Sequence, residues 1–428
     1  MAKFDEIQVD QRLPFLQSLP LSFQHLFAMF GATVLVPIIF GVNPATILLM
    51  NGVGTLLYIF ITKGKIPAYL GSSFAFIAPV GLVISQFGYG YALGGFLAVG
   101  IILTLVGLLV KVAGTGWIDV LFPPAAMGAI VAVIGLELVP VAAGQAGLIG
   151  DNLDATTIIV ALLTLGITVI GWVTFRGFFK IIPILIGFVA GYAIAYFFGL
   201  VDFTTVKEAA WFQVPTFYTM QFDWSAILII IPAALVLIPE HIGHLFVTSN
   251  IVKKDLAKDP GLDRSLMGNG ISTILSSFIG STPNTTYGEN IGVLAVTRVY
   301  STWIIGGAAV ISILLSFVGK LAALISSIPN AVLGGISLLL FGIIAASGIR
   351  MLVEAKVDYN KSQNLILTCV ILVIGISGAT LKIGEVGLSG MGLATVVGIL
   401  LSILFKLFDI LKLSNEENDN DKKQKLVS

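Results

Sequence analysis

Charged residues are scarce in this sequence. Only 11 % of the 428 residues are Asp, Glu, Lys or Arg, whereas 57 % are hydrophobic, and the mean hydropathy is +1.01. Soluble globular domains carry about 25 % charged residues, so this composition excludes a chain whose main solvent is water. The formal net charge is zero, which leaves no excess of positive charge for holding nucleic acid.

Cysteine is almost absent as well. The one cysteine, Cys369, lies inside an apolar run, so the sequence predicts neither an intrachain disulfide nor a cysteine metal site. A phosphate-binding loop, a metal-ligand cluster and a spaced Ser, His and Asp set are also missing, so we predict neither an enzyme nor a bound metal or cofactor. The first twelve residues mix acidic and basic side chains, which does not match a removable signal peptide.

Long apolar runs are abundant instead. Crossing a hydrocarbon core of about 30 Å takes about 20 mostly apolar residues in a helix, and such runs recur from Leu21 to Leu411. We therefore predict an all-α membrane protein that forms one membrane unit with about fourteen transmembrane segments. The expected segments are 21–40, 44–62, 66–85, 89–110, 119–140, 156–175, 181–199, 224–249, 265–280, 283–298, 300–319, 321–347, 364–381 and 387–411.

The basic residues support this arrangement. When alternate connections are assigned to opposite sides, 20 of the 23 Lys and Arg residues fall on one side, as the positive-inside rule requires of the cytoplasmic face. We expect both termini on that face of the cell membrane, and a solvated, disordered tail at 413–428. The basic residues on the other face are Lys207, Lys320 and Lys382.

The two halves of the chain show weak similarity in a preserved order. With about seven spans in each half, an odd number, the second copy must be inverted in the membrane, which is a transporter architecture. The matching pairs are His25-Leu26-Phe27 with His244-Leu245-Phe246, Gly71-Ser72-Ser73 with Gly280-Ser281-Thr282, and Pro123, Gly128 and Ile130 with Pro329, Gly334 and Ile336.

Helix breakers interrupt one pair of corresponding spans, the third (66–85) and the tenth (283–298). We expect short unwound or extended stretches there, because irregular backbone at membrane depth survives only where protein buries it or a polar cavity receives it. Kinked packing helices with small residues at their contacts are the alternative. The breakers are Pro67, Gly71 and Pro79 in one span, and Pro283, Gly288 and Gly292 in the other.

Three glutamates lie inside apolar runs: Glu137, Glu240 and Glu289. A charge at the bilayer centre costs about 2.5–3.5 kcal/mol on insertion scales, so each needs a reason. Glu137 stands near the end of its run, where an interfacial position explains it. Glu240 and Glu289 lie deeper, and we predict that they form a substrate site.

All three histidines also lie in apolar runs. Glu240 and His244 are one helical turn apart and share a face, so we predict that this pair couples transport to protons. His241 points elsewhere on the helix and is interpreted as a packed, hydrogen-bonded residue. A carboxylate accepts hydrogen bonds, and unwound backbone offers both donors and acceptors, so a neutral planar solute with N–H and C=O groups fits the site. Phe74 and Tyr287 either pack against its faces or simply fill space.

The stretch from Glu289 to Arg298 carries an acidic residue followed by Asn-x-Gly-x4-Thr-Arg. This pattern resembles the signature of the nucleobase–ascorbate transporters (nucleobase:cation symporter 2), and Gln24-His25 resembles the paired motif of their first span. The resemblance extends over about residues 13–412 and is closest to bacterial uracil carriers of that family. The motif residues expected to support the site are Gln24, His25, Ser72, Asn290 and Thr297.

The resemblance implies fourteen spans as two inverted repeats of seven, divided between a core domain that holds substrate and a gate domain. It also implies that Glu240 and Glu289 hold the pyrimidine together with backbone at Phe74 and Gly288, that His244 takes part in proton coupling, and that the protein is a homodimer. Phe341 stands where a tyrosine is expected. The core would comprise 13–118 (spans 1–4) and 216–319 (spans 8–11), and the gate 119–215 (spans 5–7) and 320–412 (spans 12–14).

The sequence therefore favours a uracil:proton symporter of the cell membrane, in which the core moves against the gate by alternating access. Uracil, protons and the lipid bilayer are the expected partners, with the proton as coupling ion. The competing hypothesis is an anion transporter or channel of similar inverted-repeat fold, in which half-helix N-termini bind the anion. Two carboxylates in one site argue against it, because they would repel an anion.

Overall fold

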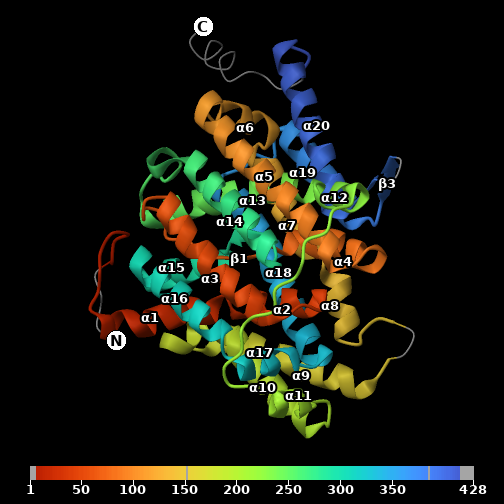
Figure 1. Ribbon diagram of the computed structural model, residues 1–428. Helices are drawn as coiled ribbons and strands as arrows, with labels where there is room; N and C mark the ends of the chain where they lie inside the picture. The colour runs from red at the N-terminus through yellow and green to blue at the C-terminus, as the bar shows by residue number, and fades with distance from the viewer. Residues whose placement is uncertain (1–5, 151–152, 384–385, 415–428) are drawn as a thin grey trace.

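A computed structural model describes residues 6–150, 153–383 and 386–414, and helices dominate it from end to end (Figure 1). The expected disordered tail at 413–428 falls almost entirely on residues outside these ranges. An apolar segment at membrane depth is expected to be a helix, because a helix satisfies the backbone hydrogen bonds within one segment. The composition and the fold therefore agree.

The first half of the chain runs from α1 to α10. Helix α3 shows how local sequence sets a boundary: Gly41 ends α2 with φ of 67°, and the Asn43 side chain then caps α3 by accepting from the Ala45 N–H at 2.9 Å. The elements are α1 (Phe15–Ala28), α2 (Phe30–Phe40), α3 (Pro44–Ile61), β1 (Leu70–Ser72), η1 (Phe74–Phe76), α4 (Ile77–Gln86), α5 (Tyr89–Ala113), α6 (Gly116–Leu121), α7 (Pro124–Glu137), α8 (Val139–Gln145), α9 (Ala155–Thr174), η2 (Gly177–Ile181) and α10 (Pro183–Phe197).

The second half runs from α11 to α20. The expected segment 321–347 is divided here: α17 ends at Ser326, and α18 begins only after Pro329, which cannot donate a backbone hydrogen bond. The elements are α11 (Thr204–Glu208), α12 (Trp224–Ile230), α13 (Pro232–Val252), η3 (Ala257–Gly261), α14 (Leu262–Ile279), β2 (Asn284–Thr286), α15 (Gly288–Thr297), α16 (Thr302–Ser316), α17 (Gly319–Ser326), α18 (Asn330–Glu354), α19 (Ser362–Ile376), β3 (Thr380–Ile383), β4 (Val386–Ser389) and α20 (Gly390–Ile410).

Several helices are long enough to cross a membrane. In the described part of the chain, eight helical stretches have the length and apolar composition of a span, and four shorter apolar helices accompany them. The multi-pass membrane class is confirmed, whereas the count of fourteen stays a prediction. The expected segment 265–280 corresponds to α14, which is too polar to pass as a span alone because it buries a row of Ser, Thr and Asn side chains against its neighbours.

Helices of the two halves pack directly on one another. Helix α14 lies against α5 and α3, and α18 lies against α7 and α9 (Figure 1). The α5–α14 contact is close because Gly100 and Gly270 face each other: a Cβ on either would lie within 2.9 Å of the other's carbonyl oxygen. Small residues at helix contacts are the usual way in which membrane helices approach closely.

The two extended stretches meet at the centre of the protein. Strands β1 and β2 pair antiparallel with Leu70 opposite Thr286, Gly71 opposite Thr285 and Ser72 opposite Asn284. The interrupted spans predicted from the sequence are therefore interrupted, and they cross each other. Because equivalent segments of the two halves run in opposite directions here, the pairing is what an inverted repeat requires.

Candidate functional site

The strand crossing places a helix N-terminus at the centre of the fold. Strand β2 ends at Thr286, the Tyr287 N–H donates to the Tyr69 carbonyl at 3.0 Å, and α15 starts at Gly288. Glu289 stands in the first turn of α15, where backbone N–H groups lack partners within the helix. This end of α15 can therefore bind a polar ligand through its backbone as well as through the carboxylate.

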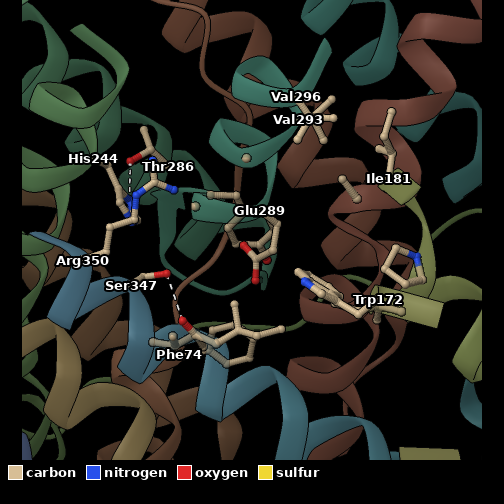
Figure 2. Close-up of a pocket in the computed structure, with 18 of the residues that line it drawn as sticks. Phe74, Trp172, Ile181, His244, Thr286, Glu289, Val293, Val296, Ser347 and Arg350 are labelled. Carbon is tan, nitrogen blue, oxygen red and sulfur yellow. Dashed lines mark hydrogen bonds between the residues drawn. The ribbon is translucent and has the colours of Figure 1, made fainter. Parts of the chain in front are cut away.

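A cavity of about 290 Å³ lies over this helix end. Glu240 and His244 of α13 line it together with Glu289, and Figure 2 shows the Glu289 carboxylate at its centre. The structure therefore brings together residues that are about fifty positions apart in the sequence. The other wall comes from Val131 and Ile134 of α7, Trp172 of α9, Lys180 and Ile181 of η2, Ile182 just before α10, Pro183 and Ile184 of α10, and Ile343, Ile344, Ser347 and Arg350 of α18.

The two carboxylates belong to one electrostatic unit. Glu240 and Glu289 line the same cavity, so their charges act on the same space. Among the described residues, Oε2 of Glu240 is buried and has no hydrogen-bond partner. A buried acceptor without a partner costs free energy, so a ligand that donates an N–H group to it would be stabilised.

His244 lies between the cavity and the strand crossing. Its Nδ1 is 3.1 Å from the Thr286 hydroxyl, the Thr248 hydroxyl donates to its carbonyl at 2.7 Å, and its Nε2 faces the backbone of Gly288. His241 does not line this cavity: its Nε2 is 2.8 Å from the Ser265 hydroxyl and its side chain is fully buried. His241 is thus packed and hydrogen-bonded, as the helical spacing predicts.

The two aromatic residues of the broken spans are placed differently. Phe74 lines the cavity, and its ring meets that of Phe341 edge-on at 5.8 Å between centroids. Tyr287 also lines the cavity but is only 3 % exposed, and its ring lies against Gly71. Phe341 is fully buried behind Phe74 and is not among the residues that line the cavity.

The motif residues form a frame behind the cavity. The Asn290 amide donates to the His25 carbonyl at 2.9 Å and is 3.3 Å from His25 Nδ1, which joins α15 to α1. Gln24 is buried on the same helix, α1. Ser72 and Thr282 share a hydrogen bond of 2.6 Å beside the strand crossing, and Thr297 accepts from the Val299 N–H at 3.3 Å just beyond the end of α15. None of these side chains lines the cavity, and their role in supporting the site stays a prediction.

Glu137 lies outside this cavity. Its Oε2 accepts a hydrogen bond of 2.8 Å from the Met391 N–H, at the first turn of α20, and Gly390 packs directly on the carboxylate. A carboxylate at a helix N-terminus is favourably placed. The structure thus gives the third membrane glutamate a contact that joins α7 to α20.

The wall formed by α7, α9, η2, α10 and α18 was missed by sequence reasoning. Trp172, Ser347 and Arg350 line the cavity, yet no motif or spacing in the sequence points to them. Apolar residues are common in every span, so their place in the cavity depends on packing that only the fold reveals. The basic Lys180 and Arg350 carried the only available signal, because both belong to the predominantly basic side.

Comparison with known proteins extends these observations. A family model described as "Permease family" matches residues 16–384. The chain is 67 % identical over 416 residues to a uracil permease of Paenibacillus larvae, covering 96 % of this chain and 99 % of that protein. It is 66 % identical over 409 residues to the uracil permease of Escherichia coli K12, covering 95 % of each chain.

A solved structure shares the fold. The murine Slc26a9 anion transporter in the inward-facing state superposes with a TM-score of 0.67 at 12 % identity, over 94 % of this chain and 69 % of that one. At this low identity the similarity concerns the arrangement of helices and strands, and says nothing of the ligand.

Proposed function

Because this chain belongs to the permease family, we propose that it is a uracil:proton symporter that imports uracil across the cell membrane. It would be a carrier rather than an enzyme. The observation that supports this most strongly is the pair Glu240 and Glu289, which line one cavity together with His244 and the backbone of Gly288.

The hydrogen-bonding groups around these two carboxylates suit a neutral pyrimidine. Uracil presents N–H donors beside carbonyl acceptors in one plane, and the carboxylates of Glu240 and Glu289 accept from N–H groups. The start of α15 offers backbone N–H groups to a carbonyl oxygen. Phe74 would contact one face of the ring. Glu240 and Glu289 would thus hold the substrate, with backbone at Phe74, Tyr287 and Gly288 completing the site.

Proton coupling would be carried by Glu240 and His244. They lie one helical turn apart on α13 and line the same cavity. Uracil is neutral, so a proton bound with it gives the transported complex one net positive charge. Each net positive charge carried inward gains about 2.3 kcal/mol per 100 mV of membrane potential, so coupling to protons can drive accumulation of uracil.

The architecture that we propose has fourteen spans, with core regions 13–118 and 216–319 and gate regions 119–215 and 320–412. On this division both regions would line the cavity, with Glu240 and Glu289 from the core and Lys180 and Arg350 from the gate. Both basic residues lie on the side that we assign to the cytoplasm, together with both termini. The cavity would therefore open inward, and movement of the core against the gate would expose it outward. A homodimer through the gate is part of this proposal.

An anion transporter is the second candidate, because Slc26a9 shares the fold and is an anion transporter. The N-terminus of α15 would favour an anion, yet Glu240 and Glu289 face the same space and would repel it. The two candidates differ in the charge of the transported solute.

Uptake into proteoliposomes tests the proposal. Labelled uracil should enter and accumulate when the outside is more acidic than the inside, and accumulation should stop when a protonophore collapses the gradient. Sulfate and bicarbonate serve as control solutes and should not enter. Uptake of either anion without any response to uracil would establish the second candidate instead.

A further inference from the structure

The cavity has two unlike sides. Figure 2 shows His244, Thr286, Ser347 and Arg350 on one side of Glu289, and Trp172, Ile181, Val293 and Val296 on the other. The first side carries an imidazole, two hydroxyls and a guanidinium group. The second side is apolar apart from the indole N–H of Trp172 and the ammonium group of Lys180, the neighbour of Ile181 on η2. We call the space between Trp172, Ile181, Val293 and Val296 the apolar slot.

The apolar slot is open rather than filled by its own side chains. Trp172 is 44 % exposed and Val296 is 51 % exposed, and both line the cavity. Gly292, one turn after Gly288 on α15, leaves further room, because a Cβ built on it would meet nothing within 4 Å. The slot therefore continues from the carboxylates along α15 toward Val296, with η2 and α9 opposite.

The cavity is larger than the substrate needs. A volume of about 290 Å³ lies close to the lower end of the roughly 300–1,000 Å³ range of cavities that hold drug-sized ligands. Uracil is one six-membered ring with two carbonyl oxygens, so it fills only the part near Glu240 and Glu289. The unfilled part is the slot, whose apolar lining favours an apolar ligand group.

We propose that the apolar slot is a binding subsite for an apolar arm attached to a pyrimidine base. The base would occupy the site at Glu240 and Glu289, so the inference rests on the proposed function, and the arm would lie between Val296 of α15 and Trp172 of α9. Such a compound binds more tightly than the free base. It is not transported, because the arm holds α15 away from η2 and α9, the surfaces that must approach for the cavity to close.

Matched pairs of uracil derivatives test this inference. Benzyl and methyl groups are compared at the same ring position, N1, C5 or C6, so that each pair keeps the same hydrogen-bonding groups on the base. Binding is measured by calorimetry with the protein in lipid nanodiscs, where no detergent competes for the slot. Burial of the phenyl ring removes enough apolar surface from water to raise the affinity of the benzyl compound about tenfold over its methyl partner. We expect this gain at one ring position at least.

Two variants locate the arm. Val296→Trp fills the slot and Trp172→Ala removes one of its walls, so each should reduce the benzyl advantage to less than about threefold while the affinity for uracil stays close to that of the wild type. Trp224→Ala is the matched control: Trp224 lies on α12, is 78 % exposed and does not line the cavity. It should keep the full advantage.

The outcomes separate the two levels of the proposal. A wild-type protein that does not bind uracil removes the proposed function, and the subsite with it. If uracil binds and no benzyl compound exceeds its methyl partner, the slot is closed to ligands or occupied by a lipid chain, and the inference is wrong. If the benzyl compound still binds more tightly than its methyl partner in both Val296→Trp and Trp172→Ala, the arm does not lie in the apolar slot. Transport of the benzyl compound at the same rate as uracil would contradict the prediction that the arm prevents transport.

Discussion

The two sides of the cavity, which we assign to the proposed core and the proposed gate, differ in what they contribute. The core side offers Glu240, Glu289 and His244 on helices that start or pass beside the strand crossing, whereas most of the gate side is aliphatic, with Val131, Ile134, Ile343 and Ile344. On the proposed function, selectivity for a polar solute would therefore reside in the part built around β1 and β2. The aliphatic side provides a surface that excludes water without forming specific bonds, which suits a part that moves relative to the substrate.

Removal of a core carboxylate should have the largest effect. Glu240→Ala deletes the acceptor that the structure leaves without a partner, and hydrogen bonds to charged groups are worth about 1.5–3 kcal/mol each. We expect uracil affinity to fall by about 100-fold, as measured by calorimetry. An affinity within threefold of the wild type would show that Glu240 does not contact the substrate.

Replacement of His244 should separate binding from coupling. His244→Gln keeps a hydrogen-bonding side chain near Thr286 but cannot take up a proton. With one coupled proton, a pH difference of one unit supports about tenfold accumulation, and the variant should lose that factor while uracil counterflow continues. Accumulation equal to the wild type would assign coupling to other groups.

Substitution on the aliphatic side should do little to affinity. Ile344→Val removes one methylene group from the cavity wall, which is worth about 0.8 kcal/mol or less, so uracil affinity should change by about fourfold or less. A titration next to Glu240→Ala makes the comparison direct. A loss as large as that of Glu240→Ala would mean that the gate side contributes to recognition.

The segment before α1, residues 6–14, should contribute least to stability among the side-chain contacts tested at neutral pH. Lys253 lies 3.1 Å from Glu6, with the lysine side chain 72 % exposed, and exposed ion pairs are worth about 0–1 kcal/mol. Glu6→Gln should therefore shift the apparent melting temperature by about 2 °C or less. Thermal melts followed by light scattering or fluorescence would check this. A shift several times larger would indicate that residues 6–14 hold α13 and α15 in place.

Low pH should remove one further surface contact. Lys65 lies 2.6 Å from Asp259, and its hydrogen bond holds the pKa of that carboxyl below the usual value of about 3.9. A depressed carboxyl pKa stabilises the fold above the unfolded pKa, and the contribution disappears as pH falls through the folded value. Asp259→Asn should thus lower the melting temperature slightly at pH 7 and by less at pH 3. An equal effect at both pH values would contradict the ionic origin of the contact.

The sequence predicted the part of the site whose side chains are costly to place in a membrane. Glu240, His244 and Glu289 stand out because charged and titratable groups are rare in apolar runs, and the broken spans were visible as Pro67, Gly71 and Pro283. The antiparallel pairing of β1 with β2 agrees with the inverted order of the two halves.

The sequence could not predict the opposite wall or the exact spans. Trp172 and Ile344 resemble the other apolar residues of their helices, so their position depends on how α9 and α18 pack. Helix α14 buries Ser265, Asn269 and Ser276, a polar face that hydropathy penalises although neighbouring helices cover it. The break at Pro329 was missed because long apolar stretches on both sides outweigh the few polar residues beside it, Ser326, Ser327 and Asn330.

Uracil binding by two matched variants tests the central claim most directly. Glu289→Gln changes a carboxylate in the cavity, and Glu137→Gln changes a carboxylate that instead contacts the start of α20. We predict that Glu289→Gln weakens uracil binding by about tenfold or more and that Glu137→Gln leaves it within twofold of the wild type. Equal affinities in the wild type and Glu289→Gln would contradict the assignment of the two carboxylates as the uracil site.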